Sequence, residues 1–481
     1  MDEHAAGPAP GLRDAMAGLV PLPGRLRPWQ VETLDHVGLA ELLTAHGSPV
    51  NLIDPEPLTA NAAALVAAGA ELGVTVRICF ARKANKALAL VDQAAAAGHG
   101  IDVSSDDELA QVLARGVEPE KVILTAAVKP ARVLDRAIRA GVAISVDSAD
   151  ELAAIRACAA ANGIFARIAP RVAPDLPHRP LSRFGLPVGE VRGLLTDPGA
   201  HVEVVGLHVH LDGYDIGDRV VMLHRMLDLV EQTGATLRFV DLGGGIPIRY
   251  LDDPAPWQEF WQAHRAGLLG DGPEQTWRNK GLGLAVHGGQ IHGAPAVYPA
   301  WQETIVGDWL RQILDGTPAG GAGESAAVRL RRLGLALQLE PGRALLEGCG
   351  LTAARVEARK QLADGSWLAV LAMNRTQCRS AADDFLVDPI LLPNPDPAAD
   401  RSPAAEGFLV GAYCIEAELI TLRRMRFPRG LAVGDIVVFV NTAGYLMHIV
   451  ESASHQMPLA RNLIRVGAGW QLDPLDGLPD R

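Results

Sequence analysis

The stretch Val-Thr-Val-Arg-Ile-Cys-Phe at residues 74–80 decides the fold, because β-branched residues dominate it as they do in strands. A segment with helical spacing follows from Lys86 to Ala97, and the alternation continues along the chain with helices expected at 107–115 and 149–161. Further apolar runs that predict strands occupy 100–103, 121–124, 143–146, 166–172, 204–210, 237–242 and 333–340. Eight strands interleaved with helices predict an α/β fold, a (β/α)8 TIM-like barrel.

The rest of the chain predicts a second domain, since 481 residues exceed what one hydrophobic core usually serves. After Leu351, short runs at 367–373, 407–410 and 435–440 carry no helical period and are separated by Gly and Pro, which is typical of β structure. We expect the barrel at 46–347 and a C-terminal all-β domain at 348–481. The Pro-, Gly- and Ala-rich start, to about Pro28, predicts a partly disordered lead-in.

One long insertion interrupts the barrel pattern at about 246–331, and it holds five of the eight tryptophans: Trp257, Trp261, Trp277, Trp301 and Trp309. We favour an added helical subdomain that packs its own small core. The alternative is a lid that shapes a substrate pocket.

Composition excludes several classes of partner and location. The chain has 44 basic and 56 acidic residues, a net charge of −12, which argues against nucleic-acid and anionic-membrane partners. The sequence contains no run of about 18 apolar residues, so we expect no membrane span. Its acidic start has no apolar stretch, so we expect no secretory signal. The five cysteines are scattered and odd in number, so we expect no disulfide framework and a cytoplasmic location.

Reactive residues gather at the predicted carboxyl ends of the strands, which meet at one mouth in a barrel. They are Lys83, Asp102, Arg171, His208, His210, Gly243, Gly244, Gly245, Glu340 and Arg343. Singly, each has an ordinary explanation: most lysines are solvated, a strand histidine is usually a core residue, and a glycine run also marks a plain turn.

Together these groups meet the needs of pyridoxal 5'-phosphate. Consecutive glycines at 243–245 free backbone N–H groups for a phosphate, and Arg343 adds a cation. Lys83 can form a Schiff base, and Glu340 can keep a pyridine nitrogen protonated. We expect no metal site, because His208 and His210, like the loop histidines His287 and His292, lack a third ligand at a recognisable spacing.

An ordered series of short motifs runs along nearly the whole chain: Phe80-Ala-Arg-Lys83-Ala-Asn85, Gly100-Ile-Asp-Val-Ser104, Ser182-Arg-Phe-Gly185, Gly206-Leu-His-Val-His210, Asp241-Leu-Gly-Gly-Gly245, Glu340-Pro-Gly-Arg343, Gly411-Ala-Tyr-Cys414 and Ala443-Gly-Tyr445. With these motifs the chain resembles the fold-type III, or alanine-racemase-like, pyridoxal-phosphate enzymes. It is most similar to their diaminopimelate, ornithine and arginine decarboxylases.

The resemblance implies a cofactor site in the N-terminal barrel and a role for each matching residue. Lys83 would be the aldimine lysine, His210 would stack on the ring, and Glu340 would pair with the pyridine nitrogen. Gly243–Gly245 and Arg343 would hold the phosphate, with Asp102 and Arg171 as support. Tyr445 would reach the phosphate, and Cys414 would return the proton to Cα, both from the partner in a head-to-tail homodimer. Residues 1–45 would join the β domain.

Glu340 also bears on the type of reaction. A carboxylate at the ring nitrogen favours decarboxylation through a Schiff base and a quinonoid, whereas the racemase branch has an arginine there. A racemase, epimerase or eliminase of the same fold remains an alternative. A non-catalytic, antizyme-inhibitor-like binding protein is a further one, against which Lys83, Glu340, Arg343 and Cys414 argue together.

Several positions depart from the decarboxylase pattern. Ile415 stands where an acidic residue usually reads the distal amine, and Glu416 or Glu418 are the nearest replacements. The usual His-Ile-Gly-Ser run reads His210-Leu-Asp-Gly213, without the hydroxyl for the phosphate. Arg375 or Arg379 is a candidate for a distal carboxylate. We therefore expect a non-standard amino-acid substrate, of open identity and chirality, that contacts Arg379, Cys414, Glu418 and Tyr445.

Overall fold

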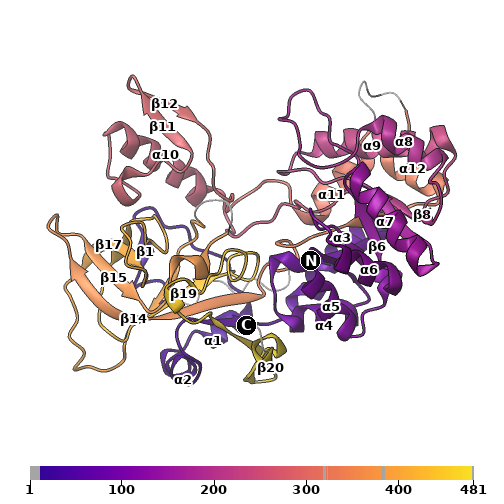
Figure 1. The fold of residues 1–481 in the computed structure, drawn as a ribbon. Helices are drawn as coiled ribbons and strands as arrows, with labels where there is room; N and C mark the ends of the chain where they lie inside the picture. Colours follow the sequence, from indigo (N-terminus) through magenta and orange to yellow (C-terminus); the bar gives the residue numbers. More distant parts are fainter. Residues whose placement is uncertain (1–10, 318–320, 322, 381–384, 479–481) are drawn as a thin grey trace. The chain divides into compact units, whose positions relative to one another are not determined.

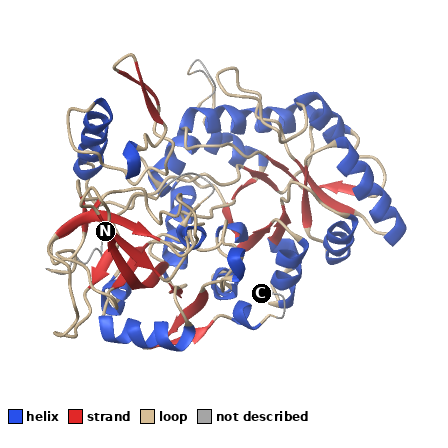
Figure 2. Cartoon of the chain, turned by 60° about the vertical axis from the view of Figure 1, so that its left-hand side comes forward, coloured by secondary structure: helices blue, strands red, loops and turns tan. Residues whose placement is uncertain are grey.

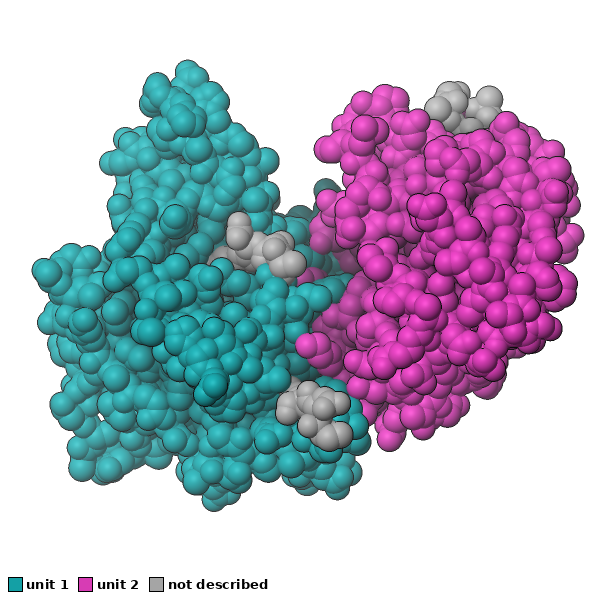
Figure 3. Space-filling model, in the orientation of Figure 1, with its two compact units in different colours: residues 1–57, 248–303, 346–481 teal, residues 58–247, 304–345 magenta. Residues whose placement is uncertain are grey.

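The computed structural model describes residues 11–317, 321, 323–380 and 385–478. The chain divides into two compact units (Figures 1 and 3). One, here the barrel unit, consists of Leu58–Pro247 and Thr304–Leu345. The other, here the β unit, consists of the chain up to Pro57, Ile248–Glu303 and Leu346 onward.

Nine parallel strands form the barrel unit's sheet in the order β8-β7-β6-β5-β4-β3-β13-β10-β9. Their bounds are β3 (Val76–Ala81), β4 (Gly100–Val103), β5 (Val122–Leu124), β6 (Ala143–Val146), β7 (Ala166–Pro170), β8 (Val202–Val204), β9 (Gly206–His208), β10 (Phe239–Asp241) and β13 (Ala336–Leu339). The single run expected at 204–210 forms two short strands flanking Val205, of which β8 pairs with β7 and β9 with β10. A bridge between Arg171, directly after β7, and His208 of β9 links the two ends of the sheet past the short edge strand β8, so the sheet closes almost fully and the expected barrel is confirmed.

Helices alternate with these strands and surround them (Figure 2). They are α3 (Pro57–Glu71), α4 (Leu88–Ala96), α5 (Asp106–Ala114), α6 (Ala131–Ala140), α7 (Ala149–Asn162), α8 (Val188–Thr196), α9 (Ile216–Thr233), α11 (Val306–Asp315) and α12 (Ala326–Leu333). Ser105 and Ser148 cap α5 and α7, since each hydroxyl accepts a backbone N–H three residues on, at 3.1 and 3.2 Å. None of the described helices combines the length and apolar character needed to cross a lipid bilayer.

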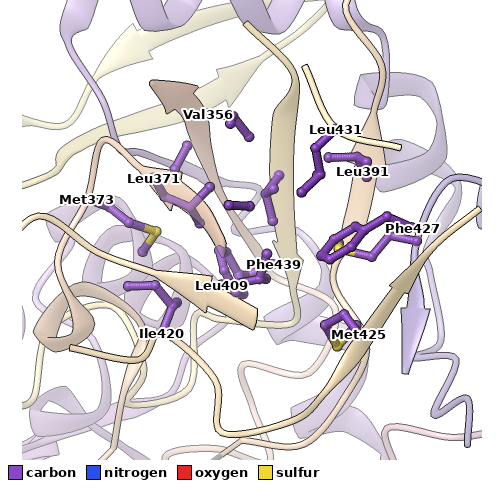
Figure 4. Close-up of a cluster of buried hydrophobic side chains, with 14 of the residues drawn as sticks. Val356, Leu371, Met373, Leu391, Leu409, Ile420, Met425, Phe427, Leu431 and Phe439 are labelled. Atoms are coloured by element: carbon purple, nitrogen blue, oxygen red, sulfur yellow. The ribbon is translucent and has the colours of Figure 1, made fainter. Parts of the chain in front are cut away.

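The β unit is built around one long strand, β14 (Gly350–Gln361), which pairs with β15 (Trp367–Leu371), β19 (Ile436–Val440) and β2 (Val50–Ile53). The remaining strands of its ten-stranded sheet are β1 (Ala17–Gly18), β16 (Ile390–Leu392), β17 (Ala405–Val410), β18 (Met425–Phe427), β20 (Arg461–Val466) and β21 (Gly469–Leu472). Apolar side chains such as Val356, Leu371 and Phe427 meet in its core (Figure 4). The expected C-terminal β domain is therefore present, as a unit that is mostly β.

The N-terminal segment is ordered where it is described, which corrects the expectation of a disordered lead-in to Pro28; residues 1–10 lie outside the described part. β1 pairs with β18, and α1 (Pro28–Thr33) and α2 (His36–His46) follow. The Asp388 carboxylate accepts the N–H groups of Gly18 and Leu22 at 3.1 and 3.0 Å. These bonds fix the segment to the β unit.

The tryptophan-rich stretch is divided between the two units, so it does not form one helical subdomain as expected. Within 248–303, α10 (Ala255–Leu269) and the hairpin β11 (Leu284–His287) with β12 (Gln290–Gly293) belong to the β unit, where Trp277 packs edge-on against Phe408 at 4.9 Å. Trp309 lies in α11 of the barrel unit, and its indole N–H donates to the carbonyl of Tyr214. The lid alternative stays untested.

Candidate active site

The barrel mouth holds the polar residues that the strand pattern predicted. Lys83 lies in a 3-10 turn (Arg82–Ala84) directly after β3, and Asp102 lies in β4. His208 ends β9, and the glycine run 243–245 follows β10. The other members follow their strands in the same way: Arg171 after β7, His210 after β9, and Glu340 and Arg343 after β13.

Lys83 offers an amine at the mouth with a carboxylate beside it. Its Nζ lies 2.6 Å from Oδ2 of Asp102, whose side chain is fully buried, while about a third of the lysine side chain (32%) is exposed. The hydroxyl of Thr125 donates to the other oxygen of Asp102. An amine must lose a proton before it attacks a carbonyl, and the adjacent carboxylate is placed to accept that proton.

Glu340 is a buried carboxylate without a full set of partners. Oε2 lies 3.7 Å from Nε2 of His208, and Oε1 has no hydrogen-bond partner among the described residues. Burial, with the nearby charges of Asp102 and Asp241, raises the pKa of Glu340 well above its usual value. Such a group gains most from a ligand that brings a proton or a positive charge to its free oxygen.

His208 is held as a neutral ring next to this carboxylate. Burial lowers its pKa well below the usual value, with the Arg171 charge adding to the effect. The Ser145 hydroxyl lies 2.7 Å from Nδ1, so Nε2 faces Glu340. Ligating atoms of His208, His210 and Glu340 lie within 4.8 Å of one another, so the structure supplies the third group that sequence spacing did not reveal. The Lys83 amine and the anion cradle beside them match pyridoxal phosphate better than a metal alone.

The glycine run packs against His210, and only glycine fits there. Gly243 has a φ of +66°, and a Cβ at this position would lie 2.4 Å from Nδ1 of His210. Burial, followed by the Lys83 charge, lowers the pKa of His210 to about 3, so the ring is neutral. Among the described residues the backbone N–H groups of Gly245 and Ile246 have no hydrogen-bond partner. Free N–H groups on a loop of this kind suit an anion such as phosphate.

Arg171 supports the mouth from the side. Its guanidinium lies 4.2 Å from the ring centroid of Phe184 and 3.8 Å from Oδ1 of Asp147. The same Asp147 oxygen accepts the N–H of Gly185 at 2.7 Å. Arg171 thus links the end of β7 to the Ser182–Gly185 motif.

The β unit holds the predicted proton donor and the predicted phosphate tyrosine. Cys414 is exposed, and its Sγ lies 3.5 Å from Nε2 of His455. The ring of Tyr413 stacks on His455, with centroids 4.6 Å apart and planes 15° apart. Tyr445 follows β19 and is half-buried, with a φ of +72° in the left-handed region. Non-glycine residues adopt this conformation rarely, and often at functional sites.

The predicted substrate residues of the β unit lie close to one another in sequence but in different surroundings. Glu418 is buried, which raises its pKa, and its Oε1 accepts the N–H of Arg375 at 2.8 Å. Glu416 is exposed and pairs with Arg278 at 3.2 Å. Oε2 of Glu418 and Nε of Arg379 are buried without a hydrogen-bond partner in the described chain.

The barrel residues fit pyridoxal phosphate by their own chemistry. Lys83 supplies the amine, Glu340 a buried oxygen for the pyridine nitrogen, and the loop at 243–246 free N–H groups for the phosphate. Sequence reasoning missed Thr125, Ser145 and His455. A polar residue within or directly after an apolar strand was the available signal for the first two, whereas His455 lies in an irregular segment without one.

Comparisons with known proteins agree with this fit. The sequence profile of the family described as "Pyridoxal-dependent decarboxylase, pyridoxal binding domain" matches residues 62–268. An uncharacterised protein, y4yA, of Sinorhizobium fredii is 32% identical over 451 residues, covering 91% of this chain and 92% of the relative. Diaminopimelate decarboxylase of Pseudomonas aeruginosa is 26% identical over 438 residues, 86% and 87% of the two chains. The fold is similar to the crystal structure of Helicobacter pylori diaminopimelate decarboxylase complexed with L-lysine, with a TM-score of 0.65 and 18% identity over 90% and 95% of the chains.

Proposed function

Because the chain belongs to the fold-type III pyridoxal-phosphate decarboxylase family, we propose that it removes the α-carboxylate of an amino acid. The observation that carries this proposal is Glu340, a buried carboxylate with an unpartnered oxygen in the same barrel mouth as the Lys83 amine. A carboxylate at the pyridine nitrogen favours full delocalisation of a carbanion, which decarboxylation needs.

The barrel residues bind and orient the cofactor. Bound pyridoxal phosphate supplies the electron sink for the electron pair left when carbon dioxide departs. Lys83 would hold the cofactor through Nζ, and Asp102, 2.6 Å away, is placed to take and return the proton of that atom. Neutral His210 would cover the ring of the cofactor, and Gly243–Gly245 with Arg343 would hold the phosphate.

We propose that Cys414 and Tyr445 complete the site from a second copy of the chain in a head-to-tail homodimer. Cys414 Sγ would hold the proton that Cα receives. The exposure of this thiol and its contact with His455 support the role, because an imidazole can restore the proton to a thiolate.

The substrate contacts we propose are Arg379, Cys414, Glu418 and Tyr445. Ile415 is 45% exposed and offers no charge to a distal amine, while Oε2 of the buried Glu418 has no hydrogen-bond partner in the described chain and lies 3.9 Å from Nε of Arg375. Arg379 likewise has a buried, unpartnered Nε. These features support a substrate other than ornithine or lysine, whose decarboxylation yields a diamine. They favour an amino acid with a polar group on its side chain.

The type of reaction is tested by two measurements on the same panel of amino acids. Purified enzyme in D2O is given L-, D- and N-substituted amino acids, and both CO2 release and deuterium at Cα are measured. The proposal expects CO2 from at least one acid, with one deuterium in the amine product. Deuterium in a recovered amino acid without CO2 loss would instead establish a racemase or epimerase.

The shared site is tested by mixing two inactive variants. In a head-to-tail dimer, K83A and C414A chains that exchange subunits form some dimers with one intact site, and random pairing restores about a quarter of the sites. The matched control mixes K83A with the double variant K83A/C414A, in which no intact site can form. Activity no higher than in this control would show that each chain supplies its own thiol.

A further inference from the structure

Arg219, at the start of α9 in the barrel unit, is a fully buried cation that grips two loops of the barrel mouth. Its Nη2 donates to the carbonyl oxygens of Gly213, Gly245, Gly244 and Leu211 at 2.7, 3.2, 3.3 and 3.4 Å. Its Nη1 donates to the carbonyl of Asp215 at 3.2 Å. The guanidinium therefore ties the loop 211–213 to the glycine run 243–245.

This cation has no paired anion of its own. Within the described part of the chain no carboxylate lies within ion-pair distance of Arg219, and neighbouring Asp218 is engaged by Arg179 and by His178, the latter at 2.7 Å. Burial lowers the pKa of Arg219 to about 10, so it remains charged at neutral pH. The ring of Trp309, with its centroid 5.0 Å away, offers a π face but no negative charge. A buried, unpaired charge is costly and calls for a compensating ligand nearby.

The direction of the peptide groups shows where that ligand would lie. In a trans peptide the C=O and the following N–H point in opposite directions. The carbonyls of Gly244 and Gly245 face Arg219, so the N–H groups of Gly245 and Ile246 face away from it. For both of these N–H groups the described part of the chain offers no hydrogen-bond partner. A cation on the carbonyl side polarises both peptides and makes their N–H groups better donors to an anion.

We propose that Arg219 is the positioning residue of the phosphate cradle, and that it confers preference for a phosphorylated pyridoxal over the unphosphorylated aldehyde. The proposal rests on the proposed function. Arg219 acts through the backbone of the glycine run rather than on the anion itself. It supplies positive charge to a loop in which Gly213 offers no side chain and exposed Asp212 adds a negative charge.

The geometry leaves little freedom for this arrangement. Gly245 has a φ of +74°, and a Cβ there would lie 2.5 Å from Nη2 of Arg219 and 2.9 Å from the carbonyl oxygen of Gly213. The Arg219 guanidinium thus fills the space that a side chain at position 245 would need. An uncharged side chain at 219 would leave the carbonyls without a donor and the peptides unpolarised.

The test compares the affinities of two ligands that differ only in the phosphate. Full-length chain stripped of cofactor is titrated with pyridoxal phosphate and with pyridoxal, and binding is followed by the ligand's visible absorption. In R219M we expect pyridoxal phosphate to bind about 10- to 100-fold more weakly, the range expected for loss of charge-assisted hydrogen bonds. Pyridoxal affinity should change less than about twofold, since it lacks the group that the cradle holds.

Two further variants separate positioning from folding. R219K keeps the charge and should recover much of the lost phosphate preference. R225M removes an arginine from the same helix that donates to the carbonyl of Asp175 at 2.9 Å, and it should bind both ligands like wild type. Circular dichroism and melting curves are recorded for each variant.

The outcomes are distinct. Equal weakening of both ligands in R219M and R219K would reduce Arg219 to a structural residue and overturn the inference, as would unchanged affinity for both. If R219M does not fold, R219K decides: the same ligand ratio as wild type supports the role of charge, and a loss of affinity for both ligands opposes it. Wild-type chain that binds neither ligand would instead refute the proposed function.

Discussion

Replacing Glu340 by glutamine separates two effects of this carboxylate: the loss of folding stability caused by its burial, and its interaction with the bound cofactor. In the chain without cofactor, burial and the nearby charges of Asp102 and Asp241 raise the pKa of Glu340 well above its usual value. The unfolded chain titrates this group near the ordinary value of about 4.3. Between these two values the folded chain holds a proton that the unfolded chain has released.

The sign of the effect follows from proton linkage. When folding raises the pKa of a carboxyl group, that group contributes fully to the stability of the folded state only below the pKa it has in the unfolded chain. Its contribution is lost as the pH rises from there to the raised value, by about 1.4 kcal/mol per pH unit. The E340Q chain lacks this titrating group. Over this pH range the stability of E340Q relative to wild type, measured as the difference in free energy of unfolding, should therefore increase by about 1.4 kcal/mol per pH unit. Asp241, with a pKa raised to about 6 by burial, gives both chains a further loss of the same sign.

The assay is urea unfolding of cofactor-free wild type and E340Q at several pH values from 5 upward, followed by circular dichroism. Glu259 is exposed, so E259Q makes the same chemical change at the surface and should follow wild type at every pH. Addition of pyridoxal phosphate should reverse the order, because the pyridine nitrogen then needs the carboxylate. Parallel curves for wild type and E340Q without cofactor would refute the reasoning that Glu340 is a buried, neutral acid.

Three further predictions follow from other residues. K83A should show neither the cofactor's visible absorption nor covalent attachment after borohydride treatment, while its circular dichroism stays that of wild type. D388A should lower the free energy of unfolding by about 3–5 kcal/mol in urea, because it leaves the buried Arg423 without its carboxylate and frees the N-terminal segment. H455N should slow alkylation of Cys414 by iodoacetamide at neutral pH several-fold, because Nε2 of His455, 3.5 Å from the sulfur, is placed to accept the thiol proton as the sulfur attacks; an unchanged rate would show that the contact is incidental.

The barrel was predictable from sequence because its signals are local. Most of the strands are short, apolar and followed by a capped or periodic helix, as Ser105 and Ser148 show at the starts of α5 and α7. The N-terminal segment was not predictable in this way. Its Pro and Gly content suggested disorder, yet the N–H of Gly18 donates a hydrogen bond to the carboxylate of Asp388, 370 positions further along the chain. Composition carries no information about so distant a partner.

The site was predictable to the extent that residues follow the ends of strands. Lys83, Asp102, Glu340 and the glycine run meet that condition, and the structure brings them to one mouth. Arg219 does not meet it, because it lies one turn into a helix whose sequence gives no sign that the guanidinium turns toward the loops. Its role depends on four carbonyl groups from two loops, which only the folded chain brings together.

Three buried carboxylates of the barrel mouth show how the fold marks one residue for chemistry. Asp102 is satisfied by Lys83 and Thr125, and Asp241 by the N–H of Gly243 and the amide of Gln338, both at 2.7 Å. Glu340 alone of these three keeps an oxygen without a partner. Since a buried carboxylate without partners destabilises the folded chain, its retention at this position is best explained by a ligand that satisfies it. The pattern of satisfied and unsatisfied groups therefore supports Glu340 as the residue that faces the cofactor, independently of any relative.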